Sequence, residues 1–257
     1  MRYPDGFFGW IDLMTRDAGT AGQFYEALFG WTHVDVQVSE GVTHTHFYKD
    51  DCLVAGMSHM MPGIPESIRS IWNSYVLVND LDATSRRVEE AGGTVTRTPW
   101  HLLDRGRMAM IEDPTGAVLG LLEPTQMQGA ELFNAPGSLT WNELQTREPA
   151  VAMPFYERVF AWEWVEGPGD EYWVANLPTK QSADQSNAGL MMMPAAVPAG
   201  APNSWMVYFA VEDCDKAIET AERFDGQVFL PSMSAGPGRF AGLSDPTGGM
   251  FFVMQFD

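Results

Sequence analysis

A repeated pattern of aromatic and polar residues is the feature that most constrains how this chain can fold. The segment from Trp10 to Trp31 matches the segment from Trp141 to Trp162 at a shift of 131 residues, and ten of the 22 paired positions are identical. Two further blocks recur in the same order, at shifts of 133 and 132 residues. Because self-similarity at a fixed period indicates duplication, we expect two copies of one structural unit with nearly equal loops.

Local patterns predict the elements of the first copy. Asp17 caps a helix with apolar residues at helical spacing, and Gly30 ends it. A hairpin turns on the Asp-Pro-Thr-Gly segment 113–116, which recurs at 245–248. Alternating patterns between turn residues predict the other elements. The predicted strands cover 10–15, 33–38, 42–48, 53–60, 72–78, 107–111 and 117–122, and a second helix covers 82–91.

The repeat also predicts how the chain is divided. We expect a first domain over residues 1–123, a linker over 124–136 with proline at both ends, and a second domain over 137–257. Each copy holds two half-modules of related order, a helix followed by strands. In the second copy the segment 178–187 replaces the tight turn after Tyr48. We expect this segment to form a mobile loop beside whatever the sheet encloses.

Composition and charge narrow the class of protein. With 45% apolar and 19% charged residues, the chain is typical of a soluble globular protein. Its formal net charge of −19 disfavours nucleic acid and anionic membranes as partners, and it would concentrate cationic small molecules. An acidic surface also serves simply to keep a protein in solution. The start lacks a secretory signal, and Cys52 and Cys214 occupy non-equivalent places, so we expect free thiols in a cytoplasmic monomer or homodimer.

The combined motifs resemble a known superfamily. A start of the form W-x-[DE]-L-x-T followed by FYExxFGW, and a strand hairpin on D-P-T-G, resemble the glyoxalase, bleomycin-resistance and extradiol-dioxygenase (vicinal oxygen chelate) superfamily. The likeness is nearest to its tandem glyoxalase-like branch, whose members are labelled antigen-like proteins or hydroxylases. The resemblance covers nearly the whole chain and implies an α+β fold. Tandem βαβββ modules with curled mixed sheets would form a ligand cup.

The same resemblance implies where a metal ion would bind. In metal-dependent relatives a His or Gln on the first strand and a Glu on the last strand of each copy hold the ion. The matching positions here are Trp10, Gly120, Trp141 and Phe252. None of these side chains offers the imidazole, carboxylate or thiolate that such a cation requires. We therefore predict no inherited metal site and no cofactor.

Other residues that share strand faces with these positions suggest what the cup would bind. Alternation groups Asp12 and Met14 with Trp10, Glu143 and Gln145 with Trp141, and Met254 with Phe252. Aromatic and methionine side chains with one carboxylate per half are typical of an adaptable apolar pocket. The alternative is that these side chains simply fill the interior of the barrel.

The charged and imidazole groups leave further alternatives open. Asp12 and Glu143 could bind a cationic ligand or act as a general base, but the repeat favours structural ion pairs with Arg107 and Arg239. A less favoured alternative is a metal site at the histidines, because His44 and His46 share a strand face and His59 lies on the next predicted strand.

Two functions are compatible with these residues. The first is metal-independent sequestration of a small aromatic molecule that can carry a positive charge, as in drug-resistance proteins of the superfamily. The second is an enzyme of the isomerase, lyase or oxygenase type in secondary metabolism or detoxification, with Asp12, Glu143 or the histidines as catalytic candidates. Whether there is turnover stays open at this point, and the sequence does not name the ligand.

Overall fold

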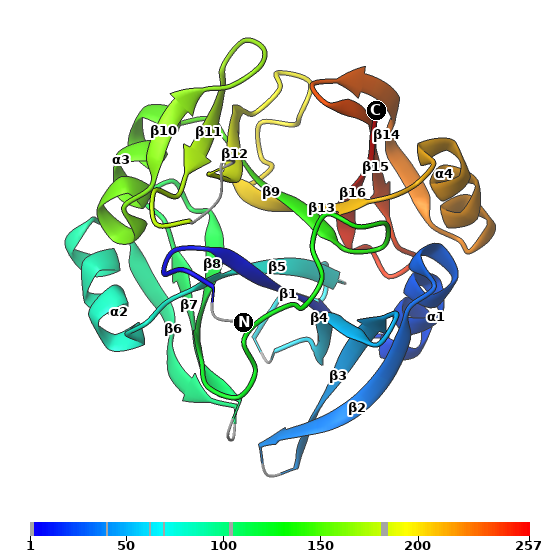
Figure 1. Cartoon of the computed structure of the whole chain (residues 1–257), viewed down its shortest axis with the longest axis horizontal. Coiled ribbons are helices and arrows are strands. Elements are labelled where there is room, and N and C mark those ends of the chain that lie inside the picture. The colour runs from blue at the N-terminus through cyan, green and yellow to red at the C-terminus, as the bar shows by residue number, and fades with distance from the viewer. Residues whose placement is uncertain (1–2, 40, 62, 69, 103–104, 181–184) are drawn as a thin grey trace. The chain divides into compact units, whose positions relative to one another are not determined.

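The computed structural model describes residues 3–39, 41–61, 63–68, 70–102, 105–180 and 185–257 (Figure 1). Within these ranges each copy contributes eight strands and two helices in the same order. The elements of the first copy are β1 (Phe8–Thr15), α1 (Ala18–Phe29), β2 (Thr32–Ser39), β3 (Val42–Lys49), β4 (Cys52–His59), β5 (Ser70–Leu77), α2 (Leu81–Glu90), β6 (Thr94–His101), β7 (Gly106–Glu112) and β8 (Val118–Pro124). Those of the second are β9 (Leu139–Thr146), α3 (Pro149–Phe160), β10 (Glu163–Glu166), β11 (Tyr172–Asn176), β12 (Ser186–Met192), β13 (Ser204–Ala210), α4 (Cys214–Arg223), β14 (Gln227–Ala235), β15 (Gly238–Ser244) and β16 (Met250–Phe256).

The two sheets repeat one topology. Their strand orders are β2-β3-β4-β1-β5-β8-β7-β6 and β10-β11-β12-β9-β13-β16-β15-β14, so every strand of the second sheet occupies the place of its counterpart in the first. Both sheets are mixed, since β1 runs parallel to β4 while β3 runs antiparallel to β4. The predicted duplication and the α+β class with mixed sheets are confirmed.

The predicted ends of the first helix are also confirmed. Asp17 is the N-cap of α1, and its side chain accepts a hydrogen bond from the Thr20 backbone N–H. Gly30 ends the helix with φ +67°, a left-handed conformation that glycine adopts without steric cost. Ala161 takes the same conformation after α3, with φ +56°. Both α1 and α3 therefore end at a residue in the left-handed conformation, although this residue is glycine only in the first copy.

One strand in each copy was missed by the sequence patterns. These are β6 and β14, which contain Pro99 and Pro231 and lie at the outer edge of their sheets. Their pairing with β7 and β15 is interrupted by register shifts, between Arg97 and Trp100 in the first copy and between Leu230 and Met233 in the second. Proline lacks the N–H that a central strand needs, so an edge strand with a bulge is where it is tolerated.

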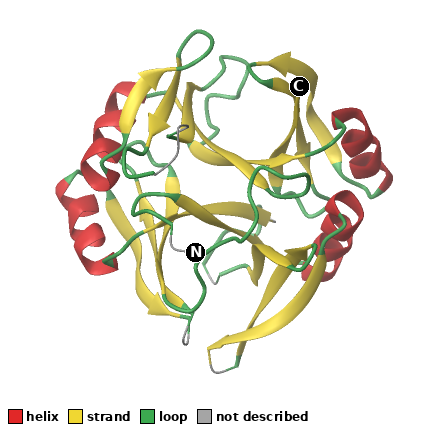
Figure 2. Ribbon diagram, viewed as in Figure 1, coloured by secondary structure: helices red, strands yellow, loops and turns green. Residues whose placement is uncertain are grey.

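Close contacts divide the chain into two compact units, each with segments from both copies. One unit comprises Met1–Trp10, Ser74–Gly129 and Trp141–Trp205; the other comprises Ile11–Asn73, Ala130–Thr140 and Met206–Asp257. Each unit has its own hydrophobic core. The first unit contains α2 and α3, which contact each other, and the second contains α1 and α4, which do likewise (Figures 1 and 2). The domain boundaries expected from the repeat stay a prediction.

The repeated tyrosine and Asp-Pro-Thr-Gly motifs meet in a buried hydrogen-bond network. In the second unit the Tyr25 hydroxyl donates to Asp245 Oδ2 at 2.7 Å and accepts from Trp72 Nε1 at 2.8 Å. The other oxygen of Asp245 accepts from the backbone N–H groups of Thr247 and Gly249. Burial, followed by the Asp245 charge, raises the pKa of Tyr25, so the phenol stays protonated and acts as donor.

The first unit contains the equivalent network. The Tyr156 hydroxyl donates to Asp113 Oδ2 at 2.8 Å and accepts from Trp205 Nε1 at 2.9 Å. In both networks the tyrosine of one copy therefore pairs with the aspartate of the other. These motif residues stabilise the fold and are not available to a ligand.

Candidate functional site

The strand faces opposite the cores carry the residues predicted to form a site. On β1, Ile11 and Leu13 belong to a hydrophobic core, so alternation places Asp12 and Met14 on the other face. On β9, Leu144 is in the core, and Glu143 and Gln145 lie on the other face. The predicted site residues thus alternate along these strands with residues of the hydrophobic cores, and their grouping into a site stays a prediction.

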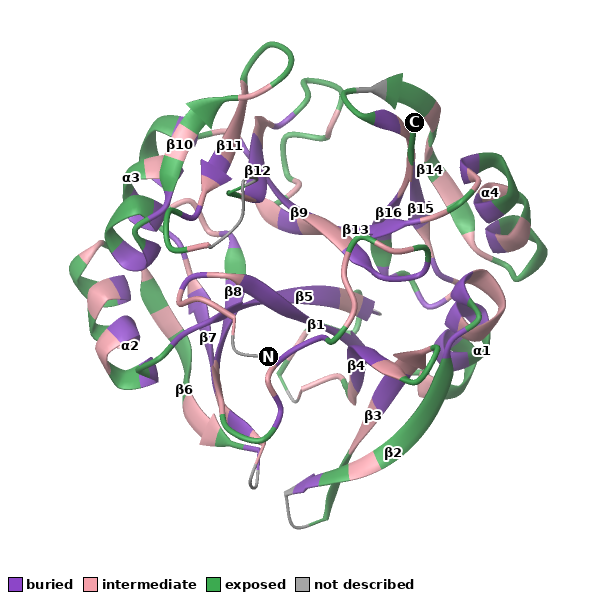
Figure 3. Cartoon of the chain, viewed as in Figure 1, coloured by how far each residue is buried: buried purple, intermediate pink, exposed green. Residues whose placement is uncertain are grey.

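Both faces of these strands are largely buried. Strand β1 is buried along its whole length (Figure 3), with Trp10 at 0% and Asp12 at 2% exposure. Glu143 is buried, whereas Trp141 and Gln145 are half-buried. The predicted site residues on β9 are thus more accessible to solvent than those on β1.

In the first copy, Asp12 binds a histidine and a serine. Its Oδ2 lies 2.6 Å from His44 Nε2, and its Oδ1 accepts a hydrogen bond from Ser58 Oγ at 2.7 Å. The side chains of Asp12 and His44 are 4% and 12% exposed, so the pair is shielded from water. In the strand register Gly56 stands between Asp12 and His46.

In the second copy, a different set of groups occupies the equivalent place. Glu143 pairs in register with Gly189, and its Oε1 accepts from Gln145 Nε2 at 3.3 Å. The Tyr172 hydroxyl accepts from Trp141 Nε1 at 3.0 Å. Burial, followed by the Glu143 charge, raises the pKa of Tyr172 well above its ordinary value, so the phenol stays protonated. This cluster is a hydrogen-bonding site with one buried carboxylate.

Gly189 is required for this arrangement. A Cβ atom there would collide with the Tyr172 hydroxyl and would lie 2.7 Å from Trp141 Nε1. Glycine therefore allows the indole and the phenol to meet above the strand. Tyr172, Gly189 and Ser58 were not among the predicted site residues. The repeat offset of 133 relates Gly189 to Gly56, but it relates Ser58 to Met191 and Tyr172 to Ser39, so only the glycine has a signal in the repeat.

The four positions that would hold a metal ion are occupied by residues that cannot ligate one. Gly120 pairs in register with Tyr75, whose Cγ would lie 2.6 Å from a Cβ at position 120. Phe252 pairs with Tyr208, and their rings stack with centroids 4.5 Å apart and an interplanar angle of 11°. Trp10 is fully buried and Trp141 bonds to Tyr172. The donor set does not fit a divalent metal ion, and tyrosine rings cover both last-strand positions.

The histidine cluster considered from the sequence is not assembled as a metal site. The His44 and His46 rings lie 5.7 Å apart at 82°, but His59 is exposed at the end of β4, where it pairs in register with Thr15. No group of three or more His, Cys, Asp or Glu side chains within the described ranges could hold a metal ion.

The predicted ion pairs with arginine were wrong. Arg107 lies 2.7 Å from Asp82 and 3.5 Å from Glu123, and Arg239 binds both carboxylate oxygens of Asp215 at 2.9 Å. These contacts join the start of a helix to a neighbouring strand at the surface. Both guanidinium groups are therefore engaged by carboxylates other than Asp12 and Glu143.

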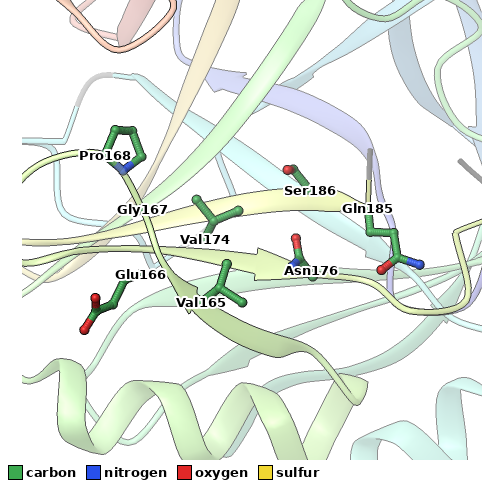
Figure 4. A pocket seen from close by; sticks show the side chains of 8 residues that line it. All are labelled: Val165, Glu166, Gly167, Pro168, Val174, Asn176, Gln185 and Ser186. Carbon is green, nitrogen blue, oxygen red and sulfur yellow. The ribbon is translucent and has the colours of Figure 1, made fainter. Parts of the chain in front are cut away.

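A hollow of about 400 Å³ is lined by residues of β10, β11 and β12 and of the segments next to them (Figure 4). It is an open depression, and Tyr172 lies at its edge because a Cβ at Gly167 would be 2.5 Å from the tyrosine ring. Val174 and Asn176 share the strand face of Tyr172. The lining residues are Val165, Glu166, Gly167, Pro168, Val174, Asn176, Gln185 and Ser186.

The segment 178–187, expected as a loop, reaches this hollow only in part. Gln185 and Ser186 line the hollow, while Ser186 and Asn187 already belong to β12. Residues 181–184 lie outside the described part of the chain. The expectation that this segment lies beside the site is consistent with the residues that are described.

We predict that replacing Gly120 by a larger residue destabilises the fold. Gly120→Ala should lower the free energy of unfolding by about 1–3 kcal/mol, because the added methyl group overlaps the Tyr75 ring. Gly22→Ala is the matched control, since a Cβ there meets nothing within 4 Å and alanine favours the helix. Urea unfolding measures both. Equal stability of the two variants would contradict the close packing of the Tyr75 ring on Gly120.

Comparison with known proteins places the chain in a family. The model of the glyoxalase/bleomycin resistance protein/dioxygenase superfamily matches residues 8–121. A protein of Mycobacterium bovis named "Putative glyoxylase CFP32" is 38% identical over 258 residues, covering 98% of this chain and 96% of that protein. The chain belongs to this superfamily. The resemblance found from the motifs is thereby confirmed.

The chain is also similar to a biosynthesis protein and to a solved glyoxalase structure. The anthracycline biosynthesis protein DauV of Streptomyces sp. is 32% identical over 270 residues, covering 99% of this chain and 94% of that protein. The Mn(II)-bound glyoxalase of Novosphingobium aromaticivorans has a TM-score of 0.64 at 14% identity, covering 98% of this chain and 85% of that chain. The structural likeness confirms the fold.

Proposed function

We propose that this protein binds a small aromatic molecule, neutral or cationic, without an inherited metal ion. The observation that carries the proposal is the replacement of all four metal-ligand positions by Trp10, Gly120, Trp141 and Phe252. Flat aromatic rings with one carboxylate nearby suit a planar ligand better than they suit a hard cation. The half-buried Trp141 beside Glu143 and the adjacent hollow support the second copy as the place of contact.

The charge and the relatives support the ligand class. A net charge of −19 favours capture of a cation over capture of an anion. DauV and a second relative, DnrV of Streptomyces peucetius, are named for anthracycline biosynthesis, and anthracyclines are fused-ring aromatic compounds. The part of the chain that the structure describes has no helix long and apolar enough to cross a membrane. With Cys52 and Cys214 as free thiols, we place the protein in the cytoplasm as a monomer or homodimer.

A second candidate function is that of an enzyme. The observation that favours it is the shielded contact of Asp12 with His44, because a carboxylate-bound imidazole is a common general base. In this case the protein would convert the aromatic molecule instead of only holding it. Product formation distinguishes the two functions.

Titration with an anthracycline and with its uncharged aglycone tests the proposal. We expect saturable quenching of tryptophan fluorescence at one or two ligands per chain, with the same affinity before and after treatment with EDTA. Elemental analysis of untagged protein gives the metal content in parallel. Binding that needs an added divalent ion, or a stoichiometric metal lost on changing His44 or His46, would contradict metal-independent binding.

A further inference from the structure

The hollow on β10, β11 and β12 lies on the same sheet face as the cluster around Glu143. Glu143 pairs in register with Gly189, and Gly189 pairs in turn with Val174. Val174 then pairs with Val165, and both valines line the hollow. Residues paired in register on neighbouring strands lie on one face, so this row runs from the cluster into the hollow. Two strand spacings separate Glu143 from Val174, a distance of about 10 Å that one molecule of several linked rings can span.

The Tyr172 phenol stands between the two parts of this face. Its ring meets the edge of the hollow, since a Cβ at Gly167 would lie 2.5 Å from a ring carbon. Its hydroxyl lies over Gly189, where a Cβ would collide with it, and accepts a hydrogen bond from Trp141 Nε1 at 3.0 Å. The phenol therefore divides the face into a compartment beside Trp141 and Glu143 and the hollow on its other side.

The side chains that line the hollow differ in kind from those of the cluster. Val165 and Val174 form an aliphatic surface, and the carboxamide groups of Asn176 and Gln185 lie to one side of it (Figure 4). Asn176 alternates with Val174 along β11 and so shares its strand face. None of the described residues that line the hollow is aromatic. The hollow therefore offers hydrogen-bond donors and acceptors beside an aliphatic floor, and no ring for stacking.

The uncharged character of the hollow narrows what it can bind. Glu166 pairs in register with Trp173, which packs against the hydrophobic core, so alternation directs the Glu166 carboxylate to the opposite face of the sheet. The other described side chains that line the hollow are uncharged. A planar aromatic system finds its stacking surface at Trp141. A sugar ring matches the hollow, because its C–H face is apolar and its rim carries neighbouring hydroxyl groups that can pair with carboxamides.

We propose that the hollow binds a sugar ring carried by the aromatic molecule whose planar part lies at Trp141 and Glu143. The C–H face of the sugar packs on Val165 and Val174, and the Asn176 carboxamide donates to one hydroxyl group and accepts from its neighbour. Binding is non-covalent. This inference rests on the proposed binding of an aromatic molecule, and it identifies the chemical class of that molecule as a glycoside.

The N-acetyl derivative of doxorubicin and the doxorubicin aglycone test the proposal. N-acetylation leaves the sugar without a positive charge, so the two compounds differ in a neutral sugar alone. In a titration of tryptophan fluorescence, we expect the wild-type protein to bind the glycoside about tenfold more tightly than the aglycone, because the sugar adds hydrogen bonds. Asn176→Leu keeps the size of the side chain but removes its donor and acceptor. It should weaken binding of the glycoside about fivefold and change binding of the aglycone by less than about twofold.

Matched variants separate a failure of this proposal from a failure of the proposed function. Gln23→Leu removes an exposed carboxamide from α1 and should change neither affinity. Trp141→Ala should weaken binding of both compounds by the same factor. Gln185→Ala is the second variant should Asn176→Leu fail to fold, and it should act on the glycoside alone.

Three results would overturn the sugar site but leave aromatic binding intact. These are equal wild-type affinities for the two compounds, equal weakening of both by Asn176→Leu, and a preference for the glycoside that persists in both carboxamide variants. The absence of any fluorescence response to either compound would overturn the proposed function and this inference with it.

Discussion

Replacing Asp245 by alanine is expected to lower the free energy of unfolding by about 3–5 kcal/mol. Its carboxylate is 2% exposed and accepts hydrogen bonds from Tyr25 at one oxygen and from the Thr247 and Gly249 backbone at the other. Bonds to a charged group are worth more than neutral ones, and the variant leaves several buried donors without an acceptor. Thermal or urea unfolding would measure the loss.

The matched control is Asp215→Ala, which also removes a carboxylate from the second unit. Asp215 binds Arg239 at the surface, where its side chain is 59% exposed. Water replaces such a contact readily, so the loss should be much smaller. Equal losses in the two variants would contradict a structural role for the tyrosine–aspartate network. Asp113→Ala tests the same network in the first unit and should behave like Asp245→Ala.

The repeat made the fold predictable to a large extent. Matching residues fixed the duplication and the turn at Asp-Pro-Thr-Gly without any structural information. The partners of the motifs could not be predicted, because Tyr25 lies 220 residues from Asp245 and local patterns do not report long-range pairing. The two edge strands were missed because Pro99 and Pro231 interrupt the alternation on which strand prediction depends.

The candidate site was predictable in its residue types but not in its contacts. The identity of Trp10, Gly120, Trp141 and Phe252 was enough to predict the lack of metal ligands. The aromatic cover over the last strands required the structure, because Tyr75 and Tyr208 reach these positions from a neighbouring strand.

The contact between His44 and Asp12 depended on strand order. These residues lie on β3 and β1, which are separated in the sheet by β4. Their side chains meet across β4, and this contact is evident only when the strand order is known. Sequence alternation therefore predicted which residues share a face but not which of them would pair.

The largest expected effect on binding belongs to Trp141. Its indole is half-buried, bonds to the Tyr172 hydroxyl at 3.0 Å and lies on the strand face that carries Glu143. Stacking on this ring should contribute roughly 1–2 kcal/mol beyond the burial of ligand area. Trp141→Ala should therefore weaken binding of a planar cationic aromatic compound by at least about tenfold, since 1.4 kcal/mol corresponds to a factor of ten. Fluorescence titration measures the affinity.

Glu143→Gln should have an effect of similar size on the same cationic compound, and a smaller one on its uncharged analogue. The carboxylate is 5% exposed, so its attraction for a bound cation is only weakly screened, while glutamine keeps the shape and a hydrogen-bonding oxygen. Comparing the charged compound with the neutral one separates two contributions to binding affinity, that of charge and that of packing. Only the charge contribution depends on the positive charge of the ligand.

Two controls decide whether Trp141 contacts the ligand or belongs to the core. Trp164→Ala removes an indole that packs against the hydrophobic core of the same unit, so it should lower stability without changing affinity. His59→Gln should change neither. If Trp141→Ala behaves like Trp164→Ala, its indole fills the interior. The ligand must then contact the residues near His44 and His46 or those of the 178–187 segment. In that case Glu143→Gln should also leave the affinity unchanged.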